Sequence, residues 1–172
     1  RVCCMYAIKQ AMLLNGALPL ADITIYYMDI RTFGKGYEQF YQNAQAMGVE
    51  FVRAKVAKIR EDEEMNPVVR VEMTETGEVV ERTHDLIVLS LGMVPAYDPR
   101  QMYQVALGKD QFVHVPALNS EPCLTDREGI FVTGTAMQPM DIVDSIVTAG
   151  AAAVSASAYI REHKNGKAAA EK

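Results

Sequence analysis

The stretch that decides the fold is EGIFVTGTAMQPMDIVDSIVTAGAAAVSASAYI, residues 128–160. A short apolar strand is predicted at residues 129–132, and the turn Thr133–Ala136 follows it. A long alanine-rich helix is predicted to begin at about Ile142 and to fade near His163. Together, the strand, the glycine turn and the helix N-terminus predict a site where backbone amides and the positive end of a helix face an anion.

The chain before this stretch alternates between helical and strand patterns. On one predicted strand, Val49 and Phe51 face one side and Val52, Ala54 and Val56 face the other. This order of elements is that of the second part of a nucleotide-binding α/β unit. The predicted helices cover residues 4–15 and 35–47, and the predicted strands cover residues 23–28, 49–59, 68–73, 78–82 and 85–91. The last strand, DLIVLSL, is nearly all apolar, which is typical of a central strand covered on both faces.

The glycine motif that binds dinucleotide phosphates is missing from the sequence. Gly34-Lys35-Gly36 lacks the third glycine of G-x-G-x-x-G, so the phosphate-binding loop is expected to lie outside this chain. The sequence begins at Arg1-Val2-Cys3-Cys4 without an initiator methionine. We therefore expect a piece of a longer polypeptide.

Composition excludes several classes of protein. The net charge is −5 and both signs are interspersed, which argues against a nucleic-acid-binding surface. No apolar run approaches the roughly 20 residues that span a bilayer, so we expect no membrane-spanning segment. Two of the three cysteines are adjacent, so they form no disulfide framework; reduced thiols in the cytoplasm are the simplest expectation.

Three stretches together resemble one family. Residues 1–11, RVCCMYAIKQA, resemble the end of a C-S-R-V-C-C segment. Residues 27–38, YMDIRTFGKGYE, resemble a characteristic strand-to-helix turn, and residues 129–142, GIFVTGTAMQPMDI, a flavin-contacting end. The family is the A subunit of heterodisulfide reductase, with the related flavoprotein subunits of the quinone-interacting membrane-bound oxidoreductase of sulfate-reducing organisms. The resemblance covers residues 1 to about 162.

The resemblance implies a partial Rossmann-like α/β fold with two dinucleotide-binding domains, as in thioredoxin reductase. Residues 1–94 would be most of an inserted NAD(P)-binding-like domain. Residues 95–164 would be the C-terminal part of an FAD-binding domain, and residues 165–172 a frayed tail. The first FAD segment, with its glycine motif, would then precede this chain.

The resemblance also implies a flavin site. Gly134 would let the backbone approach the ribityl chain, and the amides near Asp141, Ile142 and Val143 would face the carbonyl edge of the isoalloxazine ring. Thr135 stands where related disulfide reductases usually carry an aspartate. Asp141 has an alternative role as the N-cap of the helix. The complete set of predicted cofactor-binding residues is Gly92, Pro95, Gly134, Thr135, Ala136, Asp141, Ile142 and Val143.

Cys3 and Cys4 would be two of the four thiolate ligands of a [4Fe–4S] cluster in the full-length protein, with the other two upstream. Structural thiols at a helix start are the alternative. Asp29 and Arg31 follow a predicted strand, where either a ribose contact or a surface ion pair is expected. The three histidines show no metal-ligand spacing, and no residue is predicted to be catalytic.

The predicted function is that of an oxidoreductase component. The chain would be a fragment, inactive by itself, of an FAD- and iron–sulfur-containing electron-transfer subunit in a heterodisulfide-reductase-like or quinone-interacting complex. Its expected partners are the other subunits of that complex, with a homodimer as a further option and no nucleic acid. The expected location is the cytoplasm, with membrane contact only through partner subunits. The alternative is a cofactor-free scaffold or docking domain that keeps the fold and holds partner subunits.

Overall fold

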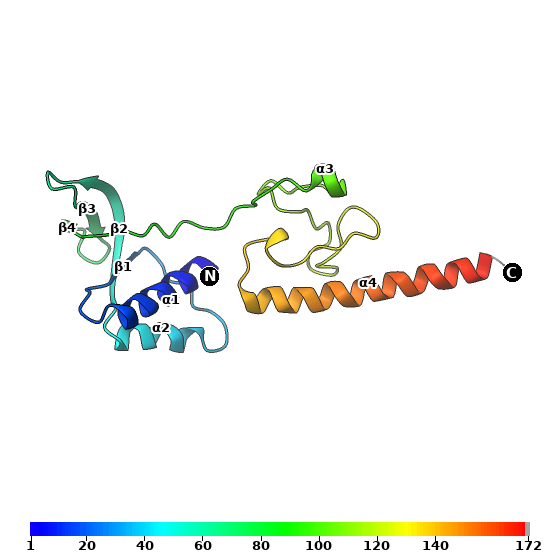
Figure 1. Cartoon of the computed structure of the whole chain (residues 1–172), viewed down its shortest axis with the longest axis horizontal. Helices are drawn as coiled ribbons and strands as arrows, with labels where there is room; N and C mark the ends of the chain where they lie inside the picture. Colours follow the sequence, from blue (N-terminus) through cyan, green and yellow to red (C-terminus); the bar gives the residue numbers. More distant parts are fainter. Residues whose placement is uncertain (171–172) are drawn as a thin grey trace. The chain divides into compact units, whose positions relative to one another are not determined.

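The chain forms two compact units. The computed structural model describes the backbone of residues 1–170 and the side chains of residues 1–163. The boundary between the units lies between Leu91 and Gly92 (Figure 1). That the units are an NAD(P)-binding-like domain and part of an FAD-binding domain stays a prediction.

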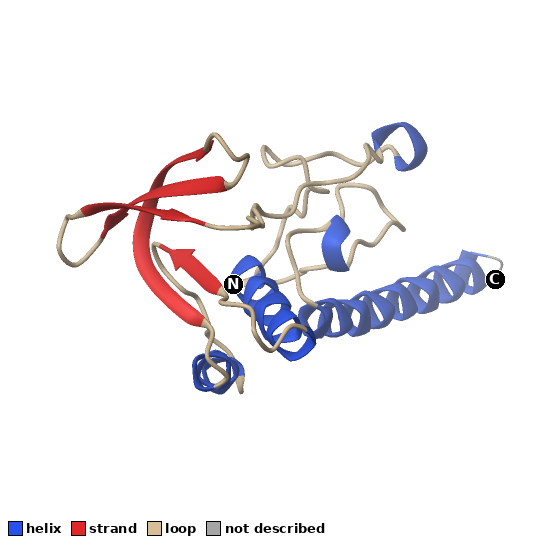
Figure 2. Cartoon of the chain, turned by 60° about the vertical axis from the view of Figure 1, so that its left-hand side comes forward, coloured by secondary structure: helices blue, strands red, loops and turns tan. Residues whose placement is uncertain are grey.

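The first unit is a four-stranded sheet with two helices. The sheet order is β1-β2-β3-β4; β1 runs parallel to β2, and the other pairs are antiparallel. Figure 2 shows β2 as a long, strongly bent strand. These elements confirm the predicted order of helix, strand and helix followed by three further strands. They are α1 (Val2–Ala17), β1 (Thr24–Tyr27), α2 (Tyr37–Ala46), β2 (Glu50–Glu61), β3 (Pro67–Met73) and β4 (Val79–Thr83).

The two faces of β2 serve two different cores. Val49, just before the strand, lies in an apolar cluster with Ile8 of α1 and Ala44 of α2, against which Phe51 packs. Val52 and Ala54 pack instead with Val69 and Val71 of β3. This division of β2 between two faces confirms the prediction.

Val56 lies where this regular alternation ends. Its side chain is 42% exposed, although the alternation along β2 predicted it on the same face as Val52 and Ala54. Val56 still pairs in register with Val71, and the register between β2 and β3 shifts directly after it, between Val56 and Lys58, so the regular alternation ends at this residue.

The prediction of a central strand at Asp85–Leu91 is wrong for this structure. The stretch is extended but belongs to no strand, and only Ile87 packs on the β2–β3 cluster. Leu86, Val88, Leu89 and Leu91 are exposed. An apolar pattern favours a strand only where neighbouring strands supply hydrogen bonds, and within the described residues no strand pairs with this one.

The second unit consists mostly of loops around one long helix. The predicted strand at residues 129–132 is wrong: Phe131 forms a single bridge with Leu124, and Gly129 turns the chain with φ 77°. The strands considered near residues 112–115 reduce to one bridge, between Leu107 and Val113. A small core of Val132, Met137 and Met140 packs against Val113 and Val115. The helical elements are α3 (Arg100–Tyr103), the 3-10 turn η1 (Gly134–Ala136) and α4 (Ile142–Ala170).

Helix α4 is longer than predicted. It begins at Ile142 as expected, but it continues past His163 to Ala170, through most of the expected frayed tail. Glu171 and Lys172 lie outside the described residues. By length and composition alone, its 22 residues Ile142–His163 are able to cross a membrane, which we expected of no segment. Apolar helices of soluble proteins meet the same criterion, so it assigns no location.

Candidate functional site

The predicted flavin contact is a tight turn followed by the start of α4. Thr133 is extended, Gly134 takes φ 63°, and η1 ends in Met137, whose amide donates to the Gly134 carbonyl at 3.0 Å. A non-glycine residue rarely adopts this φ. Gly134 therefore allows the chain to leave the loop and turn toward α4.

Thr148, on the second turn of α4, holds this turn in place. Its hydroxyl oxygen accepts hydrogen bonds from the Thr133 hydroxyl at 2.8 Å and from the Gly134 amide at 3.2 Å. It lies 3.0 Å from the Asp144 carbonyl, to which it can donate. Sequence patterns gave no reason to single out Thr148, because its role depends on contacts 14 and 15 residues away.

Asp141 caps α4. Its Oδ1 accepts a hydrogen bond from the Asp144 amide at 2.9 Å, and its carbonyl accepts from the Ser145 amide at 3.0 Å. This is the arrangement of a helix N-cap. The structure thus contains the capping role that we expected as the alternative for Asp141. The amides of Ile142 and Val143 come next, and in the described part of the chain they have no acceptor.

The start of α4 is accessible. The Ile142 and Val143 side chains are exposed, as are Thr135 and Ala136. Two free amides at the positive end of a helix are able to face an electron-rich carbonyl edge or an anion. Two features reduce this capacity: the Gly134 amide already binds Thr148, and the carboxylates of Asp141 and Asp144 lie in the same turn. The residues present therefore fit part of a flavin site.

Gly92 and Pro95 belong to a different part of the second unit. Gly92 is exposed at the start of the unit. Pro95 lines a shallow hollow of about 360 Å³, together with Tyr97, Leu107 and Asp110 among others. Their predicted contact with flavin stays a prediction.

Cys3 and Cys4 lie in the first turn of α1, and both thiols are half-buried. Two thiols are half of the four ligands that a [4Fe–4S] cluster needs. Across the described residues, no group of three or more His, Cys, Asp or Glu side chains is placed to hold a metal ion. The cysteines therefore do not form a complete cluster site here.

The start of α1 is fixed beside the loop that follows β1. The Arg1 guanidinium lies 5.2 Å from the ring centroid of Phe33 and 5.1 Å from that of Tyr37. Asp29 and Arg31, in the same loop, form an exposed ion pair at 3.3 Å. The surface ion pair expected as one alternative for these two residues is therefore present, and the ribose contact stays a prediction.

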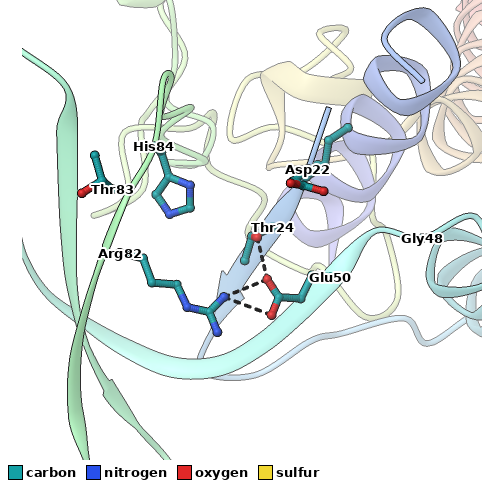
Figure 3. Close-up of a pocket in the computed structure, with 8 residues that line it drawn as sticks. Asp22, Thr24, Gly48, Glu50, Arg82, Thr83 and His84 are labelled. Carbon is teal, nitrogen blue, oxygen red and sulfur yellow. Dashed lines mark hydrogen bonds and ion pairs between the residues drawn. The ribbon is translucent and has the colours of Figure 1, made fainter. Parts of the chain in front are cut away.

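The first unit also contains a polar hollow of about 540 Å³ that sequence patterns did not predict. Figure 3 shows Thr24 and Arg82 converging on the Glu50 carboxylate. Thr24 donates to Glu50 at 2.7 Å, and Arg82 Nη1 contacts both carboxylate oxygens at 2.8 and 3.0 Å. The hydrogen bond from Thr24, followed by that from Arg82, lowers the pKa of Glu50, and the bond to Glu50 raises the pKa of Arg82.

This hollow lies at the amino ends of β1 and β2, since Thr24 and Glu50 are the first residues of the two strands. Beside it, the Tyr26 hydroxyl lies 2.9 Å from His84 Nε2, and burial raises the pKa of Tyr26. Open α/β sheets bind ligands at the opposite, carboxyl ends of parallel strands. The charged groups satisfy one another, so we assign the cluster a structural role in joining β1, β2 and β4.

A second side-chain cluster fastens the loop before η1 to α4. His163 Nε2 lies 3.1 Å from Glu128 Oε1, and His163 Nδ1 lies 3.0 Å from the Tyr159 carbonyl. The Tyr159 ring lies against His163 and meets Phe131 edge-on. Sequence reasoning placed His163 near a helix end, but it did not identify Glu128 as its partner.

The known proteins that are similar to this chain in sequence are A subunits of heterodisulfide reductases. No protein-family model matches the sequence. The chain is 42% identical over 161 residues to one of the iron-sulfur A subunits of CoB–CoM heterodisulfide reductase from Methanopyrus kandleri, covering 91% of the chain and 24% of that protein. It is 43% identical over 162 residues to the iron-sulfur A subunit of the same reductase from Methanocaldococcus jannaschii, covering 91% of the chain and 25% of that protein. The chain thus spans about a quarter of the length of these relatives.

Solved structures confirm the predicted α/β fold class. A thioredoxin reductase of Lactococcus lactis matches with a TM-score of 0.65 at 18% identity, over 92% of this chain and 50% of that one. The T. acidophilum thioredoxin reductase matches with a TM-score of 0.57 at 20% identity, over 82% and 45%. By sequence, the chain is similar over 91% of its length to a segment of the A subunit of heterodisulfide reductase, and its fold is similar to that of thioredoxin reductase.

Proposed function

We propose that these residues form part of an FAD- and iron–sulfur-containing electron-transfer subunit, and that the η1–α4 turn contributes to its flavin site. The homology supports an electron-transfer subunit of this family. The structural observation that carries the flavin assignment is the pair of free, accessible amides at Ile142 and Val143 behind the left-handed Gly134. We assign residues 1–94 to an NAD(P)-binding-like domain and residues 95–164 to an FAD-binding domain.

In this proposal each residue of the turn has a role. The Ile142 and Val143 amides, next to the capping Asp141, would donate to the carbonyl edge of the ring and favour its reduced, anionic form. Gly134 would let the ribityl chain approach the backbone, with the exposed Thr135 and Ala136 beside it. A bound FAD would supply the exchange between two-electron and one-electron transfer.

Cys3 and Cys4 would supply two thiolates to a [4Fe–4S] cluster that the rest of the protein completes. The half-burial of both thiols in the first turn of α1 is compatible with this role. The partners would be the other components of a heterodisulfide-reductase-like or quinone-interacting complex. The names of the relatives support the first of these, because they are subunits of heterodisulfide reductases. A cytoplasmic location, with membrane contact through that complex, belongs to the same proposal.

The test is the cofactor content of a full-length protein that contains this sequence. We expect a flavin absorption band and bound iron after purification. Gly134→Ala should lower the flavin-to-protein ratio, because alanine is strained at φ 63° although its Cβ would meet Ser145 only at an ordinary 3.6 Å. Gly150→Ala, on α4 with open space around it, is the matched control and should leave the ratio unchanged.

A second candidate function is a cofactor-free docking domain. It is favoured by the Gly134 amide, which is already bonded to Thr148, and by the carboxylates of Asp141 and Asp144 beside the free amides. A full-length protein with neither flavin nor iron would establish this alternative and remove the first. For the isolated chain we expect no tight FAD binding, since its residues fit only part of the site.

A further inference from the structure

We propose that Glu128 and His163 form a proton-dependent latch, which holds the loop of residues 125–131 against α4 when His163 is protonated and loosens it when His163 is neutral. The inference goes beyond the proposed function, because it concerns a response to pH and requires no cofactor. It rests on the two oxygen atoms that the His163 ring contacts, on the Tyr159 ring beside it, and on the packing of the loop.

Both ring nitrogens of His163 face oxygen atoms that accept hydrogen bonds. Nε2 lies 3.1 Å from Glu128 Oε1, and Nδ1 lies 3.0 Å from the Tyr159 carbonyl oxygen. A neutral imidazole carries one N–H and donates to only one of these oxygens, whereas the imidazolium donates to both. The geometry therefore favours the charged ring, which also forms an ion pair with the Glu128 carboxylate.

The aromatic ring of Tyr159 favours the same form. Its centroid lies 3.9 Å from that of the His163 ring, and a cation beside the face of an aromatic ring is attracted to its electrons. Burial, and then the charge of Glu128, raise the pKa of Tyr159, so its phenol stays neutral where histidines titrate. Protonation of His163 thus adds an attraction to Tyr159 as well as to Glu128.

Other ionisable side chains lie close to the latch in sequence. Of those that the structure describes, the ones within two residues are Asp126, Arg127, Arg161 and Glu162. Asp126 accepts a hydrogen bond from the Ala106 amide, and the two arginines donate to Gln104 and Ser157. Carboxyl and guanidinium groups ordinarily keep one charge between about pH 5.5 and about pH 7.5, where histidine changes its charge. The response to pH in this range is therefore assigned to His163.

The loop that contains Glu128 packs closely on α4. Gly129 takes φ 77°, and a Cβ atom at this position would lie 3.3 Å from the Tyr159 hydroxyl. Phe131 meets the Tyr159 ring edge-on. The chain then continues through Val132 into η1. Opening the latch therefore loosens the segment that leads into the candidate site.

The test is amide hydrogen exchange of residues 125–132, followed by mass spectrometry in a full-length protein that contains this chain. The Ile130 and Val132 amides donate to the carbonyls of Arg127 and Cys123, so their protection reports on the loop. We expect the protection factor to fall roughly two- to fivefold as the pH rises from about 5.5 to about 7.5, the effect of one exposed ion pair. Protection that is independent of pH, or that increases with pH, overturns the proposal.

Two substitutions test the latch itself. His163→Gln keeps a hydrogen-bond donor that cannot change its charge, so the protection of the loop should become independent of pH. Glu128→Gln removes the charge of the partner and should at least halve the dependence on pH. The matched control is His114→Gln, because His114 is exposed in the same unit and its ring has no hydrogen-bond partner among the described residues. It should keep the full dependence.

The proposal is wrong if His163→Gln or Glu128→Gln leaves the pH dependence unchanged, or if His114→Gln removes it. The flavin content of the same preparations separates this inference from the proposed function. A full-length protein that lacks flavin but shows the pH-dependent protection contradicts the proposed function and leaves the latch standing. A flavin-containing protein whose loop does not respond to pH has the opposite meaning.

Discussion

At the scale of single residues, Thr148 links the turn of the candidate site to α4. Its hydroxyl accepts from both Thr133 and Gly134, and thereby ties the turn to the side of α4. The Cys123 thiol lies 3.4 Å from the backbone carbonyl oxygen of Thr148. Burial raises the pKa of this thiol. Thr148 thus connects two loop segments with the helix.

Thr148→Val should destabilise the second unit. The substitution keeps the shape of the side chain but leaves the Gly134 amide without an acceptor, at a cost of about 1–3 kcal/mol. Thr148→Ser keeps the hydroxyl and should cost much less. Urea unfolding of the two variants would check this, and equal losses would show that packing of the methyl group, rather than the hydroxyl, matters.

Glu50 should make the stability of the fold depend on pH, and the lowered pKa gives the direction of this dependence. Its pKa in the folded protein is lowered from 4.5, first by Thr24 and then by Arg82. A carboxyl group with a lowered pKa stabilises the fold at pH values above 4.5, and this contribution is lost as the pH falls through the folded value. We therefore expect Glu50→Gln to reduce the loss of stability upon acidification below pH 4.5. Glu75→Gln, in the exposed hairpin turn, is the control; an identical acid profile for both variants would contradict the role of Glu50.

At the scale of elements, the β2–β3 pair carries the core of the first unit. Alternation along β2 sends Val49 and Phe51 toward the helices, and Val52 and Ala54 toward β3. The other two buried side chains of this second core, Val69 and Val71, come from β3. One continuous strand therefore supports two clusters.

Val71→Ala tests this core. Val71 of β3 is fully buried at 0% exposure, and removing its two methyl groups should destabilise the protein by about 2 kcal/mol. Val79→Ala on β4 removes the same atoms from a side chain that is 49% exposed, so it should cost less than about 1 kcal/mol. Thermal unfolding of both variants provides the comparison; a loss for Val79→Ala as large as that for Val71→Ala would mean that burial does not set the difference.

At the scale of the whole molecule, the stretch of chain that connects the two compact units carries several exposed side chains. Leu89 and Leu91 are exposed before the boundary, and Val94 and Tyr97 are exposed after it. Proteases bind their substrates as extended chains, so such a stretch is a preferred cleavage site.

Brief chymotrypsin digestion should therefore cut first between Leu86 and Tyr97. Mass spectrometry of the early fragments would locate the cuts, and the two products should correspond to the two units. Tyr41 of α2 is a useful internal reference, because its ring packs edge-on against Phe51. Initial cleavage at Tyr41 would contradict the assignment of residues 86–97 as the most accessible stretch.

Local signals predicted most of the first unit correctly. The helical and strand patterns of the sequence predicted α1, α2, β3 and β4, because these elements form hydrogen bonds with close neighbours in the chain. The same approach failed for residues 85–91 and 129–132. Whether such an apolar run forms a strand depends on a partner elsewhere in the chain or outside it.

For the candidate site, the sequence alone determined the chemistry at hand: a left-handed glycine, a capping aspartate and the start of a long helix. It also indicated the family resemblance, through three stretches that resemble the A subunit of heterodisulfide reductase. Only the tertiary structure decided which backbone amides of the site already donate a hydrogen bond. The Gly134 amide is bonded to Thr148, whereas no group in the described part of the chain accepts a hydrogen bond from the amides of Ile142 and Val143. Hydrogen bonds between residues 14 apart depend on how the chain folds back on itself, and no local pattern encodes them.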